Sequence, residues 1–165
     1  MDAFIRLEKP IVVAVQGAAI GGGTTMLTHC DVVYAGESAR FQLPFINLAL
    51  VPEFGSSFSV PARVGHLRAA ELFLLGEPFS ATRAAELGLV TRVVPDRDLL
   101  ATATETAQKL AAKPSGLALD RRVRSLRRAF RSLTRPTRAF WLTPPSRQHA
   151  NLASRSAGKH TRRHK

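Results

Sequence analysis

The most informative part of this chain is the stretch Ile11-Val-Val-Ala-Val-Gln-Gly17-Ala-Ala-Ile-Gly21-Gly-Gly23. Its β-branched first part, residues 11–16, predicts a buried strand, and the glycines predict a turn into a short helix from about Gly22 to His29. The combination of a strand, a glycine turn and the beginning of a helix can bring backbone N–H groups close to an oxyanion. The carboxylate of Glu53 follows downstream. These groups are suited to proton transfer next to a carbonyl.

Two other interpretations of the glycines fail at specific positions. From Gly17 to Thr24 the spacing resembles a phosphate-binding loop, but Gly23 stands where a lysine would reach the outer phosphates. The dinucleotide-binding fingerprint needs a glycine where this chain has Ala19. A purely structural role stays open, because glycines also let a helix pack closely against a strand.

The composition predicts one domain of modest size. The chain has 165 residues, 45% of them hydrophobic, and no apolar run of about 18 residues that could span a membrane. The amino terminus lacks the features of a secretory leader, so we expect a cytoplasmic protein with no membrane partner. The single cysteine, Cys30, is expected to be a small buried thiol.

The net charge of +12 is unevenly distributed. Residues 1–120 hold 10 Lys and Arg and all 12 Asp and Glu, whereas residues 121–165 hold 14 Lys and Arg and no acidic residue. From Thr134 the sequence has no helical or strand periodicity, which predicts a disordered basic tail. This tail could bind nucleic acid weakly through phosphates. Alternatively, it is a solvated segment without a role, produced by a shifted reading frame.

Local patterns predict alternating short strands and helices. After the first strand and the short helix, strands are expected at residues 32–35 and 40–42. Helices are expected at about 54–64 and 66–75, and another begins after the N-cap Ser80. The β-branched residues 89–94 predict a strand that stops at Pro95. Helices at about 97–112 and 115–130 complete an α/β arrangement.

Several motifs, in this order, carry a resemblance to a known family. They are Lys9-Pro-Ile-Val-Val-Ala-Val-Gln-Gly17, Gly21-Gly-Gly23, Cys30-Asp-Val-Val-Tyr-Ala35, Phe41-Gln-Leu-Pro44 and Ala84-Ala-Glu-Leu-Gly-Leu-Val-Thr-Arg-Val-Val94. Together they resemble the second half of the crotonase, or enoyl-CoA hydratase/isomerase, superfamily over about residues 4–128. The resemblance implies the C-terminal portion of an α/β spiral of ββα turns with a helical oligomerisation region.

The same resemblance implies partners and domain limits. The expected substrate is an acyl-CoA, with no cofactor beyond that coenzyme A, and the expected assembly is a homo-oligomer, either a trimer or a hexamer. We expect a partial crotonase-like domain at residues 1–130 and the basic tail at residues 131–165. The family's first ββα turns, its other oxyanion donor and most of its adenine-binding loop are expected to have no counterpart.

The resemblance also assigns the site. It gives the N–H of Gly22 the role of oxyanion donor, although close packing alone would also explain this glycine. Family hydratases use two glutamates, at places where this chain has Thr25 and Phe45. Glu53, in Pro52-Glu-Phe-Gly-Ser-Ser57, instead resembles the single glutamate of the Δ3,Δ2-enoyl-CoA isomerases. Substrate contacts are expected from Ala19, Ile20, Gly21, Phe45 and Phe54.

One carboxylate suffices for an isomerase, since it can take a proton from C2 of a 3-enoyl thioester and return it at C4. We expect Glu53 to lie in a buried, apolar setting among Phe45, Phe54 and Phe58. The alternative for Glu53 is a capping or first-turn acid of the following helix. For the protein, the alternatives are a hydratase-type activity or an inactive fragment that only binds or oligomerises.

Other candidate residues carry less weight. His29 and His66 do not have the spacing of metal ligands, and no metal site is expected. Ser56 and Ser57 lack the turn motif of serine hydrolases. Asp31 is expected to fix a turn after the short helix.

Overall fold

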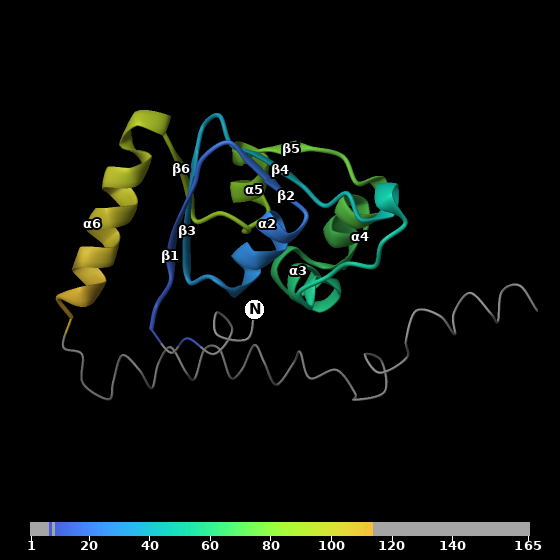
Figure 1. Ribbon diagram of the computed structural model, residues 1–165, viewed down its shortest axis with the longest axis horizontal. Coiled ribbons are helices and arrows are strands. Elements are labelled where there is room, and N and C mark those ends of the chain that lie inside the picture. Colours follow the sequence, from blue (N-terminus) through green and yellow to red (C-terminus); the bar gives the residue numbers. More distant parts are fainter. Residues whose placement is uncertain (1–6, 8, 114–165) are drawn as a thin grey trace, which may run out of the picture. The chain divides into compact units, whose positions relative to one another are not determined.

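The computed structural model describes residue 7 and residues 9–113, and its strands form two small sheets (Figure 1). The first sheet has the order β1-β3-β6 and is parallel throughout. The second has the order β2-β4-β5, with β2 parallel and β5 antiparallel to β4. The strands are β1 (Val12–Val15), β2 (Ala18–Ile20), β3 (Val32–Gly36), β4 (Arg40–Gln42), β5 (Phe79–Ser80) and β6 (Arg92–Val94).

Helical segments follow the strand pairs β1–β2 and β3–β4, and in each pair one strand belongs to each sheet. These two units have the ββα order that the family resemblance implies, whereas β5 and β6 are each followed by helical segments of their own. The helical segments are α2 (Gly22–Thr25), η1 (Met26–His29), η2 (Ile46–Leu48), α3 (Ser56–Val64), α4 (His66–Leu75), α5 (Ala81–Glu86), η3 (Asp96–Asp98) and α6 (Leu99–Ala111). In the described part of the chain, no helix is long and apolar enough to cross a membrane.

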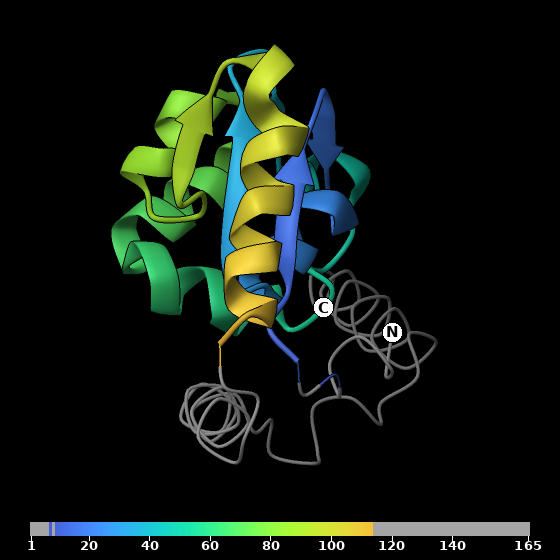
Figure 2. The same cartoon turned by 90° about the vertical axis from the view of Figure 1, so that its left-hand side faces the viewer.

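The first sheet is covered on both faces. Helix α6 lies across one face (Figures 1 and 2), where Leu99 and Ala103 pack with Tyr34 and Val94. The hydroxyl of Tyr34 also lies 3.0 Å from the hydroxyl of Thr106 on this helix. Covering on both faces explains why β1 and β3 are continuous apolar runs rather than alternating ones.

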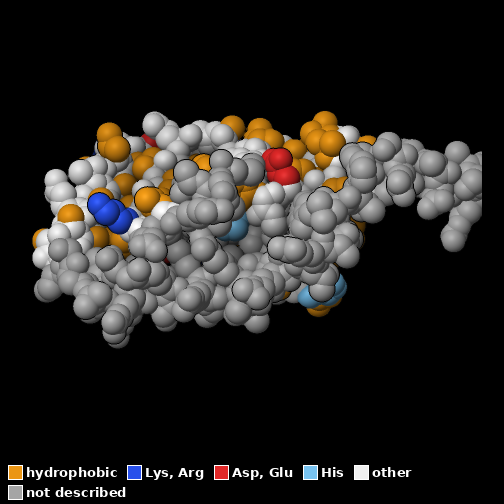
Figure 3. Space-filling model, turned by 60° about the horizontal axis from the view of Figure 1, so that its bottom comes forward, with side chains coloured by type: hydrophobic (Ala, Val, Ile, Leu, Met, Phe, Trp, Pro, Cys, Tyr) orange, Lys and Arg blue, Asp and Glu red, His pale blue; other side chains and the backbone are white. Residues whose placement is uncertain are grey.

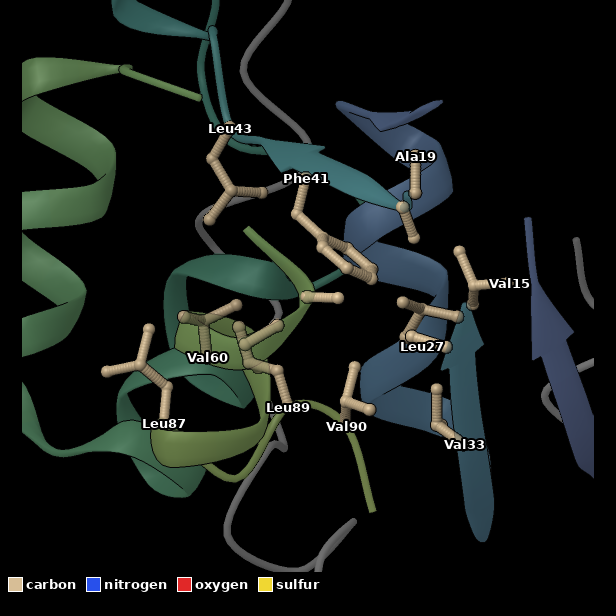
Figure 4. Packing of buried hydrophobic residues seen from close by; sticks show 14 of the residues in the cluster. Val15, Ala19, Leu27, Val33, Phe41, Leu43, Val60, Leu87, Leu89 and Val90 are labelled. Carbon is tan, nitrogen blue, oxygen red and sulfur yellow. The ribbon is translucent and has the colours of Figure 1, made fainter. Parts of the chain in front are cut away.

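The main core fills the space between the two sheets and the helices that follow them. Figure 4 shows the ring of Phe41 pointing from β4 toward Leu27 and Leu89. Phe41 is fully buried, and its ring stacks on that of Phe79 in β5 with a centroid distance of 5.8 Å. Val60 of α3 joins the same cluster. The core therefore joins β4, η1 and α3, which are the elements on either side of the candidate site.

Most of the expected elements are confirmed. The strands near residues 11–16, 32–35 and 40–42 are present, as are the helices near 54–64, 66–75 and 97–112. The expected helix at residues 22–29 is an α-helical turn followed by a 3-10 segment. Ser80 caps α5 as predicted, since its hydroxyl accepts a hydrogen bond of 3.1 Å from the Arg83 N–H.

One strand begins later than the sequence predicts, and two strands were not predicted. The strand expected from Leu89 begins only at Arg92, because the N–H groups of Leu89 and Val90 both donate to the Ala84 carbonyl and so complete the end of α5. Strands β2 and β5 were not expected at all. The helix at 115–130, the basic tail and the limits of the domains at 1–130 and 131–165 lie outside the described residues in whole or in part.

Candidate active site

The glycine run forms a sharp corner between β2 and α2. Gly21 has φ 56° and ψ −114°, a conformation that requires glycine. Its N–H donates to the Gln42 carbonyl at 2.9 Å, and its own carbonyl accepts from the N–H groups of Thr24 and Thr25, each at 3.0 Å. The corner is thus fixed to β4 on one side and to α2 on the other. Because α2 begins at Gly22, the N–H of Gly22 has no acceptor within the helix.

The segment that carries Glu53 is a second sharp corner. Both the N–H and the hydroxyl of Ser56 donate to the Glu53 carbonyl, at 3.0 and 2.6 Å. Phe54 and Gly55 follow with φ values of 59° and 67°, both in the left-handed region. Helix α3 then starts at Ser56 with Gly55 as its N-cap, no acid in its first turn and no side-chain cap. The alternative role of Glu53 as a capping or first-turn acid of this helix is therefore wrong.

The two corners bring Glu53 against Gly22. A Cβ atom placed on Gly22 in standard geometry would lie 2.9 Å from Oε1 of Glu53. The carboxylate thus occupies the space that a side chain at Gly22 would fill, at the first residue of α2. Gly22 does not have a positive φ, so the approach of Glu53, rather than backbone conformation, explains glycine at this position.

Most of the chain matches one known protein family. The model of the enoyl-CoA hydratase/isomerase family matches residues 1–140. The chain belongs to this family. Its mixed α/β architecture is the crotonase fold, and members of the family act on coenzyme A thioesters.

Relatives in the crotonase family include proteins named for different reactions. The chain is 41% identical over 115 residues to the 1,2-epoxyphenylacetyl-CoA isomerase of Escherichia coli (strain K12), which is 69% of this chain and 44% of that protein. It is 36% identical over 111 residues to the mitochondrial enoyl-CoA hydratase of Pongo abelii, which is 67% of this chain and 38% of that protein. The chain therefore spans less than half the length of these curated relatives.

A solved structure supports the same fold. The crystal structure of an enoyl-CoA hydratase/isomerase from Pseudoalteromonas atlantica T6c is similar with a TM-score of 0.77 and 42% sequence identity. The similarity covers 81% of this chain and 53% of that one.

The surroundings of Glu53 differ from those expected in this crotonase chain. Glu53 is exposed and not buried, and Phe54 and Phe58 are only half-buried. Phe45 is buried, and its ring packs against that of Phe73 with a centroid distance of 6.2 Å. The expected apolar enclosure of Glu53 was wrong, because the Phe45 side chain is used in the main core.

The predicted substrate contacts have different surroundings. Ile20 is 53% exposed at the end of β2, next to the Gly21 corner. Ala19 is buried beneath the same corner, where its carbonyl accepts a hydrogen bond from the Thr24 hydroxyl. Phe54 directly follows Glu53. Ala19, Ile20, Gly21 and Phe54 therefore border the two corners, whereas Phe45 belongs to the core; contact with substrate stays a prediction for all five.

Sequence reasoning missed a contact of His29. This histidine is the last residue of η1, and its Nε2 lies 2.9 Å from the carbonyl oxygen of Phe54. Its ring also packs against the Phe54 ring, with a centroid distance of 4.8 Å. Nothing local in the sequence signals this pairing, because the partner is 25 residues away.

Two further residues near η1 can be placed. Cys30 is buried, as expected. Asp31, expected to fix a local turn, reaches back to the start of β1, where Oδ2 accepts a hydrogen bond of 2.7 Å from the Ile11 N–H. Asp31 therefore joins β1 to β3 rather than serving only the turn.

Proposed function

We propose that this crotonase-family protein is an enoyl-CoA isomerase, in which Glu53 moves a proton and the N–H of Gly22 stabilises the enolate. The observation that carries the proposal is the position of the Glu53 carboxylate against Gly22, at the start of α2. A carboxylate beside a backbone donor is the minimum needed to enolise a thioester. The isomerase and hydratase names among the relatives fit this class of chemistry.

In the proposed reaction, a Glu53 oxygen takes a proton from C2 of a 3-enoyl thioester. The electron pair of the broken C–H bond moves onto the thioester oxygen and gives a dienolate. The Gly22 N–H donates a hydrogen bond to that oxygen, a contact worth about 3 kcal/mol in the transition state. The protonated Glu53 then returns the proton to C4, so the double bond moves from C3–C4 to C2–C3.

Isomerisation is favoured over hydration by the two places that hold glutamates in family hydratases. Thr25 is fully buried, and its hydroxyl lies 3.3 Å from the Gly22 carbonyl. Phe45 is buried in the core. Neither side chain can accept a proton from water, so hydration by two carboxylates has no base at these positions.

The remaining parts of the proposal concern partners. The substrate would be an acyl-CoA that contacts Ala19, Ile20, Gly21 and Phe54. Phe45 would support these contacts from its place in the core. The protein would be a cytoplasmic homo-oligomer. Figure 3 shows apolar side chains at the surface of one face of the molecule. The exposed apolar residues of the described chain include Leu48, Leu67 and Leu74. An exposed apolar surface is typical of a protein that is covered by a partner.

The test is the conversion of a 3-enoyl-CoA to the conjugated 2-enoyl-CoA, followed by its absorbance. Glu53→Gln keeps the size of the side chain but cannot take the proton, so we expect kcat to fall by at least about 100-fold. Glu77→Gln, an exposed acid in the turn before β5, is the matched control and should retain activity. A folded protein without turnover would refute the proposal and favour a noncatalytic binding module. Addition of water to a 2-enoyl-CoA in the same assay would instead identify a hydratase.

A further inference from the structure

We infer that His29 is a positioning residue, which helps to hold Glu53 against Gly22 by fixing the peptide between Phe54 and Gly55. The inference rests on the proposed function of Glu53. It arises from the contact between His29 Nε2 and the Phe54 carbonyl oxygen at 2.9 Å, which joins η1 to the corner before α3. His29 does not touch the reacting atoms in this scheme and acts through Phe54.

The backbone of Phe54 needs such support. Its φ of 59° lies in the left-handed region, which is unfavourable for a bulky side chain because Cβ approaches the backbone. Residues of this kind persist where surrounding contacts hold them in place. Ser56 fixes the Glu53 carbonyl on one side of Phe54, and His29 fixes the Phe54 carbonyl on the other. The peptide groups on both sides of Phe54 are therefore held, which sets the direction of the Glu53 side chain.

His29 is itself held in place by its neighbours. The hydroxyl of Thr28 lies 2.8 Å from that of Ser59 in α3. The guanidinium of Arg63, also in α3, donates to the carbonyls of Thr28 and Cys30 at 2.6 and 3.1 Å. The residues on both sides of His29 are thus tied to α3. Its ring can act as a fixed brace between η1 and the Phe54 carbonyl.

The contact requires a particular protonation of the ring. A carbonyl oxygen only accepts, so Nε2 of His29 must carry a proton to donate to it. Long-range proton–nitrogen NMR spectra distinguish the two ring nitrogens. We expect Nε2 of His29 to be protonated at neutral pH, and an unprotonated Nε2 would overturn the inference.

A second NMR measurement tests positioning without turnover. If His29 sets the direction of Glu53, then His29→Ala should shift the carboxyl carbon signal of Glu53, whereas His66→Ala should leave it unchanged. His66 is an exposed histidine at the start of α4 and serves as the matched control. A Glu53 signal that is the same in His29→Ala and in the wild-type protein would overturn the inference.

Kinetics give the functional readout. We expect His29→Ala to lower kcat about tenfold with KM within about twofold, because the group that is displaced acts in the chemical step. His29→Gln, whose amide can donate to the same carbonyl, should restore kcat to within about threefold of wild type. Equal losses in the two variants, or no loss in a folded His29→Ala protein, would refute positioning through this hydrogen bond. Absence of turnover in the wild-type protein would refute the proposed function alone, since both NMR tests remain.

Discussion

Replacing Gly22 by alanine tests the central contact of the site. The added Cβ would lie 2.9 Å from Oε1 of Glu53, and ordinary contacts begin at 3.4 Å, so the carboxylate must move by 0.5 Å. A misplacement of 1 Å can cost about 100-fold in rate, so half that displacement suggests a kcat about tenfold lower. Gly22→Val should lose more, since its larger side chain displaces the carboxylate further.

The stability of the same variant should move in the opposite direction. Gly22 has no positive φ, and the group in its way is the end of a flexible, exposed side chain. Alanine is favoured over glycine in a helix by about 0.5–1 kcal/mol. We therefore expect the free energy of unfolding of Gly22→Ala, measured with urea, to equal that of the wild type or to exceed it by up to this amount.

Gly23→Ala is the matched control. It lies in the same helix, and its Cβ would meet only the Ala19 Cβ at 3.8 Å, an ordinary contact. Its kcat for a 3-enoyl-CoA should stay within about twofold of wild type. A folded Gly22→Ala protein with wild-type kcat would refute the assignment of Glu53 as the base, and a Gly22→Ala protein that fails to fold would refute the claim that the carboxylate moves easily.

Two further predictions concern the stability of the fold. Arg63→Ala should lower the free energy of unfolding, measured with urea, by about 1–2 kcal/mol, because it removes the donor to the Thr28 and Cys30 carbonyls. The control Arg68→Ala, at an exposed position, should change this free energy little. Hydrogen bonds from Ser38 hold the pKa of the Asp96 carboxyl below its usual value. The stability that this carboxylate gives the folded protein is therefore present above the unfolded pKa of about 3.9, and it is lost as the pH falls through the folded pKa. The loss of stability in Asp96→Asn should therefore shrink below about pH 4, and a constant difference between pH 7 and pH 3 would contradict this.

Local sequence signals predicted much of the fold. The β-branched runs of β1 and β3 and the cap at Ser80 are properties of neighbouring residues, and the structure confirms them. Strand β2 could not be found in this way, because Ala18–Ile20 is short, lies between glycines and is a strand only through its pairing with β4. The late start of β6 has a similar cause, since the end of α5 captures Leu89 and Val90.

The site depended on contacts between distant segments. Glu53 and Gly22 were linked in advance only by the family resemblance, since no spacing rule connects residues 31 positions apart. The exposure of Glu53 was mispredicted because nearby phenylalanines in the sequence were assumed to surround it, whereas Phe45 packs on Phe73. His29 was set aside as a metal ligand, and its contact with Phe54 depends on how η1 and α3 pack.

The burial of Cys30 gives the protein an internal reporter. It is the only cysteine in the chain, it is 2% exposed, and it directly follows His29 at the end of η1. A thiol reagent can reach it only when this part of the molecule opens. The labelling rate therefore measures how often the end of η1 opens to solvent, and it distinguishes a variant with a redirected carboxylate from one whose whole site has come apart.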